Sequence, residues 1–259
     1  MPTISRKDFA ARLGALENRI SSLNHFVEVV ANEFRSPVYC ISDEGSCFRF
    51  QSPANAHFCI LKLARAVSGL NASMVLARNG FAQELCVLVR TIIECTTLID
   101  WVLGAVDGTD DYQNAVQSHV ASFFADHDRV AGVHTPANLK QERIHKEVGA
   151  TLDRFLSDSG IEIGRPAKEL FSKTYLTYSY YVHARYPECM DMYGGSPSKL
   201  HVRGMLQTPK DGENLDILDT FARSVELSAL HIMVRLALRS AVANHPHLRQ
   251  WLDDFDKSR

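Results

Sequence analysis

The stretch Leu85–Trp101, with the sequence LCVLVRTIIECTTLIDW, is apolar on nearly every side. A helix that is apolar all round is buried, either in the core of a protein or in a membrane. Arg90, Glu94 and Asp100 place three charges inside the stretch, and a membrane span rarely carries so many. The sequence therefore predicts the central helix of a soluble helical bundle.

Arg90 and Glu94 are the most informative residues of this helix. They stand four residues apart, which places their side chains on one helical face, with Thr97 about one turn further along. A charge inside so apolar a helix is costly unless it is paired or hydrogen-bonded. We therefore take Arg90 and Glu94 as the first candidates for a functional site.

The overall composition is that of an ordinary globular protein. Of the 259 residues, 46% are hydrophobic and 22% are charged, and the formal net charge is -2. A chain of this length can bury a large core without disulfides or structural metals. Its small net charge gives no general attraction to nucleic acids or membranes, so any contact with a polyanion must come from a local patch.

The cysteine pattern and the N-terminus indicate a cytoplasmic protein. The six cysteines stand at positions 40, 47, 59, 86, 95 and 189, and no two of them have the Cys-x2-Cys spacing of a zinc finger. Cys86 and Cys95 lie on the predicted central helix, where a free thiol acts as a small hydrophobic side chain. The first residues lack the apolar segment of a signal peptide. We expect no cofactor and no membrane association.

The N-terminal segment carries a heptad pattern. Apolar residues recur at alternating spacings of four and three: Phe9, Leu13, Leu16, Ile20, Leu23, Val27, Val30 and Phe34. This spacing is typical of a coiled coil. One interpretation is an oligomerisation arm over residues 1–36, through which two copies form a homodimer. The alternative is a long helix packed along its own domain, which uses the same seam.

The rest of the chain predicts further helices and one hairpin. Pro37 ends the first helix, and two β-rich runs around an Asp/Gly turn predict a small hairpin near residues 38–50. The remaining predicted helices cover 53–78, 85–101, 110–131, 136–159 and 166–182, and a long last helix runs from Asn214 or Asp216 to Pro246, followed by a short amphipathic tail. We therefore predict an all-α bundle of about seven to eight helices that includes the long N-terminal heptad helix, with an arm over residues 1–36 and a bundle domain over residues 37–259.

A second notable stretch is Tyr175–Tyr186, with the sequence YLTYSYYVHARY. Ser179, His183 and Tyr186 recur at helical spacing, and several tyrosines accompany the histidine. These residues supply hydroxyl donors and one group that titrates near neutral pH. If this helix faces the central one, Arg90 and Glu94 could meet His183.

Such a meeting would form a site for an anionic ligand. Glu94 would orient the imidazole of His183, His183 would act as a base, and Arg90 would hold the anion. Tyr178, Ser179, Arg185 and Tyr186 are the candidate ligand-binding residues around this cleft. The alternative is a buried polar network in which Arg90 pairs with Glu94, is capped by tyrosine hydroxyls, and only fixes the helix register.

The two motifs together carry a resemblance. Arg90-Thr-Ile-Ile-Glu94 with its apolar run, followed about 90 residues later by Tyr181-Val-His-Ala184, resembles an uncharacterised bacterial family of helical proteins. The resemblance covers roughly residues 55–205. It implies a helical fold and little about chemistry.

More distantly, the pattern is similar to that of the HEPN superfamily. Its members are small helical bundles, often dimeric, and many are metal-independent ribonucleases of toxin or defence systems with an Arg-x4–6-His signature on one helix. This sequence departs from the signature, because Thr177, Tyr178 and Ser179 stand where the arginine should precede His183. Only Arg90, on another helix, could replace it.

Three other groups of residues carry weaker signals. Arg185, Lys199, His201 and Arg203 form a mildly basic segment that could contact phosphates, although Glu188 and Asp191 interrupt it. His231, Arg235 and Arg239 form a basic stripe on the last helix, which could bind an anion, meet an acidic partner face or face solvent. His119, Asp126, His127, His134 and His145 hint at metal ligands, but without a His-x3-His pair we predict no metal site.

Three hypotheses of function follow. The leading one is an oligomeric binding protein whose polar cleft takes a small anionic ligand, a nucleotide or RNA. The second is a metal-independent HEPN-type endoribonuclease, with His183 as general base and Arg90 stabilising the phosphorane. The third is a non-catalytic scaffold in which the polar residues are purely structural.

Overall fold

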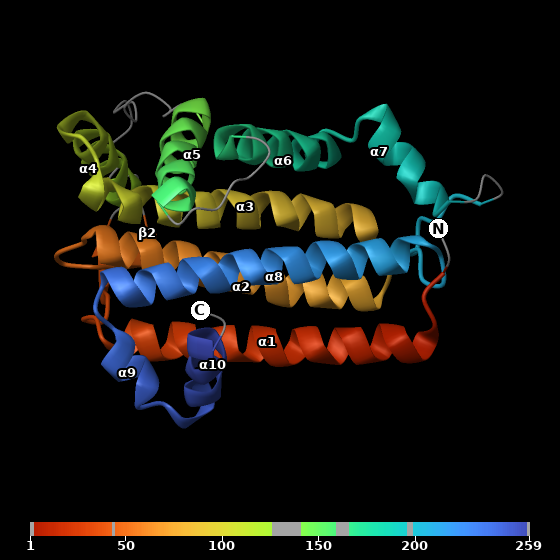
Figure 1. Ribbon diagram of the computed structural model, residues 1–259, viewed down its shortest axis with the longest axis horizontal. Coiled ribbons are helices and arrows are strands. Elements are labelled where there is room, and N and C mark those ends of the chain that lie inside the picture. Colours follow the sequence, from red (N-terminus) through yellow and green to blue (C-terminus); the bar gives the residue numbers. More distant parts are fainter. Residues whose placement is uncertain (1–2, 43–44, 126–140, 159–165, 196–198, 258–259) are drawn as a thin grey trace.

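The computed structural model describes residues 3–42, 45–125, 141–158, 166–195 and 199–257. In this part of the chain the fold is an all-α bundle with one small hairpin, which confirms the predicted fold class (Figure 1). The long elements are α1 (Arg6–Asn32), α2 (Asn55–Arg78), α3 (Ala82–Gly104), α4 (Asp110–Ala125), α5 (Gln141–Asp158), α6 (Ala167–Val182) and α8 (Lys210–Arg235). The short ones are β1 (Val38–Ser42), β2 (Gly45–Arg49), η1 (Ala105–Asp107), α7 (Tyr186–Met190), η3 (Asp191–Tyr193), α9 (Arg239–Ala243) and α10 (Pro246–Lys257).

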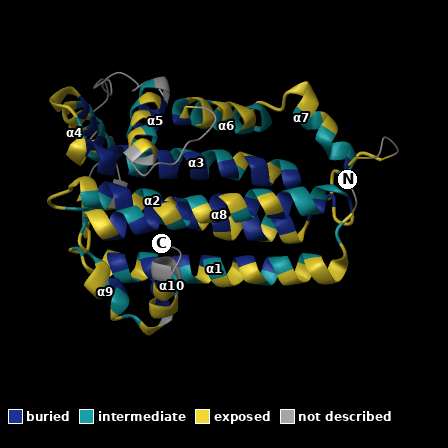
Figure 2. Ribbon diagram, in the orientation of Figure 1, coloured by how far each residue is buried: buried dark blue, intermediate teal, exposed yellow. Residues whose placement is uncertain are grey.

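Helix α3 is the central element, as its sequence predicts. It packs against α2 and α8 on one side and against α5 and α6 on the other. Its core side chains include Leu85, Ile92, Ile99 and Trp101, all of which are fully buried. Figure 2 shows buried residues along the facing sides of α2, α3 and α8. Burial of these apolar surfaces supplies the main driving force for folding.

Helix α1 belongs to the same core as α2, α3 and α8. It packs lengthwise against α2 and α8, with α9 and α10 beside it (Figure 1). Its apolar residues join the single large cluster that α2, α3 and α8 form: Leu13, Leu16, Ile20, Leu23, Phe26 and Val30. The chain itself covers much of the heptad seam of α1, which favours the alternative of a long helix packed along its own domain. The division into an arm over 1–36 and a bundle over 37–259, and a homodimer formed through the arm, stay predictions.

The second half of α1 departs from the strict heptad pattern. Phe26 is fully buried, whereas Val27 at the predicted heptad position is only partly buried. A straight α-helix has 3.6 residues per turn, so an apolar face in contact with a flat neighbour drifts by about 20° per heptad. Phe26 also contacts the ring of Trp251 on α10, with centroids 5.5 Å apart.

The predicted hairpin near residues 38–50 is present. Strands β1 and β2 pair antiparallel, with Val38 opposite Arg49 and Tyr39 opposite Phe48. The side chain of Ile41 is 81% exposed and that of Phe48 is 67% exposed. The hairpin therefore adds little to the core.

The C-terminal helices differ from the single long helix that the sequence predicts. Helix α8 begins at Lys210 and ends at Arg235, where Leu238 N–H bonds to Met233 O and Ala237 has a φ of 53°. A residue with left-handed backbone angles, together with this hydrogen bond, forms a Schellman motif at the end of a helix. Glycine usually occupies the left-handed position. The predicted end near 131 and start near 136 of two other helices lie outside the described residues.

Candidate functional site

The candidate site is built on helix α6, which α5 holds at its N-terminal end. The side chain of Asp153 on α5 accepts a hydrogen bond from the backbone N–H of Ala167, 2.9 Å away, and so satisfies one of the free donors of the first turn. Gly149 lets the two helices approach closely, since a Cβ there would lie 2.5 Å from the backbone N of Lys168. The start of α6 is therefore fixed by α5.

The two motifs predicted from the sequence meet where α6 crosses α3. Arg90 Nε donates a hydrogen bond to Ser179 Oγ at 2.9 Å, and the Arg90 guanidinium lies 3.4 Å from the centre of the Tyr175 ring. Further along, Gln83 donates to the backbone oxygen of Glu188 at 2.7 Å. From the first pair to the second, the residue numbers fall on α3 and rise on the α6 side, so α3 and α6 are antiparallel.

Arg90 is anchored on three sides. In addition to Ser179 and Tyr175, its Nη1 lies 2.6 Å from Glu94 Oε1. The Arg90 side chain is 13% exposed and that of Glu94 is 41% exposed. The ion pair therefore has its cation inside the helix interface and its carboxylate at the edge, where water reaches it.

The imidazole beside Arg90 is that of His145, not that of His183. His145 on α5 is 3% exposed, and its ring packs edge-on against Tyr175 at 5.2 Å. Its Nδ1 lies 3.3 Å from Ser172 Oγ. Burial, and secondly the positive charge of Arg90, lower the pKa of His145 below its ordinary value. Both effects favour the uncharged form of His145 within the inner cluster of Arg90, Glu94, His145, Tyr175 and Ser179.

His183 lies apart from this cluster. It is the C-terminal cap of α6, and its side chain is exposed. Ala184, with a φ of 45°, turns the chain away there, and Arg185 N–H closes the turn on the Tyr180 carbonyl. Among the described residues, no hydrogen bond or ion pair joins His183 to Arg90 or Glu94. The structure does not bring His183 to Arg90, because Arg90 lies opposite Ser179, about one turn earlier on α6, and the chain turns away directly after His183.

The four candidate ligand-binding residues divide in the same way. Ser179 and Tyr178 face inward: Ser179 bonds to Arg90, and the Tyr178 ring meets Phe221 of α8 edge-on at 5.2 Å. Burial raises the pKa of the Tyr178 hydroxyl. Arg185 and Tyr186 are exposed, and the Tyr186 side chain is 77% exposed.

The exposed residues form a second group at the C-terminal end of α6. The guanidinium of Arg185 lies 3.9 Å from the centre of the Tyr180 ring, which is a cation–π geometry. His183 and Tyr186 lie in the same short segment of the sequence, at the point where α6 ends. We call the group of Tyr180, His183, Arg185 and Tyr186 the α6 end.

The two acidic residues near the α6 end make no ion pair with Arg185 among the described residues. Asp191 accepts a hydrogen bond from the Tyr181 hydroxyl at 2.7 Å and pairs with Lys210 at 3.1 Å. One carboxylate oxygen of Glu188 is buried and has no hydrogen-bond partner within the described part of the chain. Although both residues interrupt the basic segment in the sequence, they do not neutralise Arg185 in the structure. Lys199 and Arg203 are exposed as well.

The basic stripe of the last helix meets acidic residues of its own chain. His231 Nδ1 lies 3.1 Å from Asp100 Oδ1, and Arg235 pairs with Asp107. Arg239 falls beyond the end of α8, at the start of α9. The stripe therefore helps to join α8 to the C-terminal end of α3.

The residues that hinted at a metal do not gather into one site in the described part of the chain. His119 packs between the rings of Phe58 and Trp101, and His145 belongs to the inner cluster. The other three, at positions 126, 127 and 134, lie outside the described residues. Across residues 3–42, 45–125, 141–158, 166–195 and 199–257, no three His, Cys, Asp or Glu side chains are placed to hold a metal.

Among the residues that the structure describes, one helix is long and apolar enough to cross a membrane by length and composition alone. It is α2, Asn55–Arg78, and half of its most apolar window is buried within the protein. Its buried side chains pack against α1, α3 and α8. A core helix of a soluble protein has the same properties, so this feature is compatible with the predicted absence of a membrane span.

The comparisons with known proteins give no relatives. No protein-family model matches the chain, no curated protein matches it in sequence, and no solved structure matches its fold. The resemblance to an uncharacterised helical family and to HEPN proteins stays a prediction from the two motifs.

Proposed function

We propose that the protein binds an anionic ligand that carries an aromatic base, a nucleotide or single-stranded RNA, at the α6 end. The single observation that carries the proposal is the arrangement of Arg185 on the Tyr180 ring beside exposed Tyr186 and His183. Proteins that bind single strands combine cations for the phosphates with aromatic faces for the bases. Cations and aromatic rings are both present here between Tyr180 and Tyr186.

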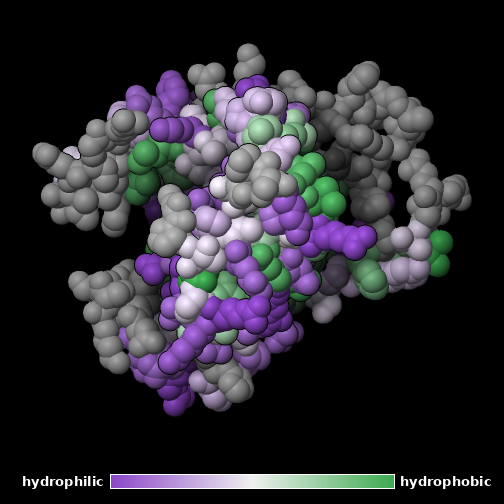
Figure 3. All heavy atoms as spheres, turned by 90° about the vertical axis from the view of Figure 1, so that its right-hand side faces the viewer, coloured by the Kyte–Doolittle hydropathy of each residue, from purple (hydrophilic) through white to green (hydrophobic). Residues whose placement is uncertain are grey.

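The inner cluster has a positioning role in this proposal. Arg90 pairs with Glu94, lies on the Tyr175 ring and donates Nε to Ser179, so its charge is already balanced, and its buried Nη1 has no hydrogen-bond partner among the described residues. It holds α6 against α3 and thereby fixes the direction in which the α6 end projects. Figure 3 looks at this end of the molecule and shows mainly hydrophilic residues, with small separate hydrophobic areas.

The experiment is fluorescence anisotropy with a labelled single-stranded RNA of about 12 nucleotides and with a labelled ATP. At about 50 mM salt we expect saturable binding of the RNA that weakens steeply as salt rises, because released counterions accompany each phosphate contact. Tyr186→Ala should weaken binding by roughly tenfold, since stacking on one base contributes about 1–3 kcal/mol.

A charge reversal at Arg185 provides the sharper test. Arg185→Glu should remove binding, whereas Arg249→Glu should not; Arg249 is an exposed arginine on α10, on the opposite side of the bundle (Figure 1). Equal weakening by both variants would mean non-specific attraction and would overturn the proposal. Cleavage of the RNA in EDTA that disappears in His183→Ala would instead establish the ribonuclease alternative.

A further inference from the structure

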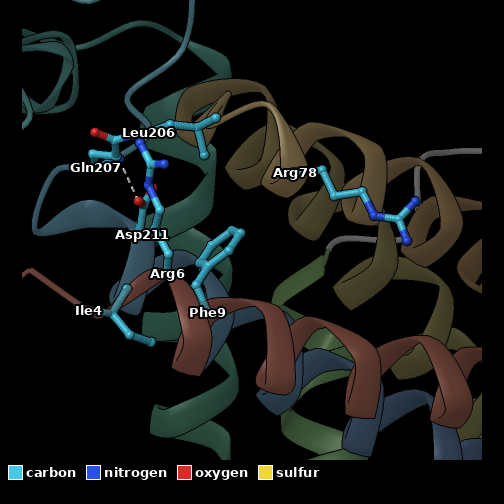
Figure 4. Close-up of a pocket in the computed structure, with 7 residues that line it drawn as sticks. All are labelled: Ile4, Arg6, Phe9, Arg78, Leu206, Gln207 and Asp211. Atoms are coloured by element: carbon cyan, nitrogen blue, oxygen red, sulfur yellow. Dashed lines mark hydrogen bonds between the residues drawn. The ribbon is translucent and has the colours of Figure 1, made fainter.

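Two connecting segments at opposite ends of the bundle differ in how the chain holds them (Figure 1). Where α1 begins, the loop before α8 forms one wall of a hollow of about 170 Å³ (Figure 4). That loop is fixed, because Met205 N–H bonds to Gly80 O at 2.7 Å and Gln207 N–H donates to Asp211 Oδ2 at 2.6 Å. Where α1 ends, the hairpin of β1 and β2 follows, and no backbone hydrogen bond ties either strand to a helix within the described residues. The hairpin is therefore the less anchored of the two segments.

The hairpin presents an apolar face to solvent. Residues opposite each other in an antiparallel pair lie on one face of the sheet, as do alternate residues of one strand. Tyr39 pairs with Phe48 and stands two residues from Ile41, so these three side chains share a face. Tyr39 is 54% exposed, Phe48 is 67% exposed and Ile41 is 81% exposed. The core of the bundle gains little from them, and apolar side chains in water favour association with another surface.

The outer edge of β1 is open. Two residues connect the strands, and in such a hairpin the flanking pair, Ser42 and Gly45, exchanges the backbone hydrogen bonds. Alternate residues of β1 then face β2, which leaves the N–H and C=O groups of Tyr39 and Ile41 on the outer edge. No backbone hydrogen bond from outside the hairpin reaches either residue in the described part of the chain. Strand β1 also lacks the charged residues and prolines that normally protect such an edge.

We infer that this edge pairs with the β1 edge of a second copy about a two-fold axis, so that two hairpins form one four-stranded antiparallel sheet. The axis passes beside Cys40. Tyr39 then exchanges two backbone hydrogen bonds with Ile41 of the partner subunit, and the symmetric pair repeats them. The apolar faces of the two hairpins join across the axis, with an aromatic side chain beside an aliphatic one in each pair. This surface shares no residue with the α6 end.

Several properties of the edge favour an identical partner over an unrelated one. A strand that pairs antiparallel with itself is self-complementary, as an interface on a two-fold axis must be. Arg49 is the only charge in the two strands, and the axis places its two copies at opposite ends of the sheet. A charged peptide finds no opposite charge along β1. The buried area is on the order of a few hundred Å² per copy, less than a stable complex needs, so the dimer is weak.

Sedimentation velocity of the full chain in reducing buffer, from about 5 µM to 500 µM, measures this association. We expect monomers at the low end and dimers at the high end, with a dissociation constant on the order of 10–100 µM. The dimer is the largest species, because it uses both β1 edges. A chain that stays monomeric over the whole range overturns the inference, and so do oligomers that keep growing with concentration.

A charge on the edge tests which surface forms the dimer. Ile41→Lys should weaken dimerisation at least tenfold, because a lysine on an edge strand opposes pairing with another strand. Leu227→Lys is the matched control, since it places the same charge on another exposed aliphatic residue, 65% exposed on α8. It should dimerise as the unchanged protein does. An unchanged dimer in Ile41→Lys would assign the contact to another face and overturn the inference; circular dichroism verifies that both variants are folded.

A cysteine that the chain already has reports the register. On the axis the two copies of Cys40 stand opposite each other as a non-hydrogen-bonded pair, with Cα atoms about 4.5 Å apart, a separation that a disulfide spans. Cys47, opposite Cys40 in β2, is first replaced by serine so that it cannot compete. Oxidation by a copper–phenanthroline complex should then link the dimer, and Cys189→Ser, which removes another half-buried cysteine, should leave the link intact. A dimer that does not cross-link, or a link that persists in Cys40→Ser, overturns the inference.

Discussion

Replacing Arg90 with alanine removes the contact that joins α3 to α6. The side chain is 13% exposed and bonds to Ser179, stacks on Tyr175 and pairs with Glu94. Glu94 is 41% exposed, so its carboxylate becomes hydrated when Arg90 is lost rather than remaining as a buried charge. The expected loss of stability therefore comes mainly from the other two contacts.

The magnitude follows from these contacts. A hydrogen bond from a charged donor contributes about 1.5–3 kcal/mol, and a desolvated cation–π contact contributes about 2 kcal/mol. A partly exposed ion pair such as Arg90–Glu94 adds roughly 0.5 kcal/mol. These contributions total about 4–5.5 kcal/mol, and removing the buried Nη1, which has no hydrogen-bond partner among the described residues, recovers about 1 kcal/mol. We expect Arg90→Ala to lower the free energy of unfolding by about 3–4 kcal/mol, and Glu94→Gln to lower it by less than about 1 kcal/mol.

Urea unfolding followed by circular dichroism measures these changes, and hydrogen exchange shows whether α6 loses protection first. The matched control is Arg185→Ala, which removes an exposed arginine that also stacks on a tyrosine of α6. It should cost less than about 1 kcal/mol. A loss below about 1 kcal/mol for Arg90→Ala, or equal losses for Arg90→Ala and Glu94→Gln, would refute the reasoning.

Three further predictions concern the rest of the bundle. In urea unfolding, Phe26→Ala should lower the free energy of unfolding by about 3–5 kcal/mol and Val27→Ala by less than about 1.5 kcal/mol. A large loss of stability in Val27→Ala would indicate instead that a coiled-coil seam passes through Val27. Glu147→Ala should lower the free energy of unfolding by about 1–3 kcal/mol and alter the fluorescence emission of Trp101, because the buried indole N–H loses its acceptor at 2.5 Å. Glu147→Gln keeps an acceptor and should have a smaller effect. Ala237→Gly should raise the urea midpoint by the equivalent of about 0.5–1 kcal/mol, since glycine adopts a positive φ without strain; a lower midpoint would contradict this reason.

The fold class could be predicted because the apolar periodicity is strong where burial is complete. The all-round apolar sequence of Leu85–Trp101 identified the central helix, and Asn79-Gly80 marked the turn before it. The end of α8 could not be found in this way, because Ala237 takes the position that glycine usually marks. The heptad pattern of α1 predicted a helix but not what the helix packs against. The same apolar seam can pack against a second copy of the protein or against the rest of its own chain.

The site could be predicted only in part. The four-residue spacing identified Arg90 and Glu94 as a pair, and their helix does face the tyrosine-rich helix through Ser179. His145 was missed as a member of the cluster because its place depends on how α5 packs, which no local pattern encodes.

The partnership of α1 with α8 has a consequence for synthesis on the ribosome. Arg12 pairs with Asp216, 204 residues later, and Arg19 pairs with Glu226. The part of the apolar face of α1 that meets α8 therefore stays uncovered until α8, about 204 residues later in the chain, has been translated. During that interval the nascent chain is prone to aggregation and suited to capture by a chaperone.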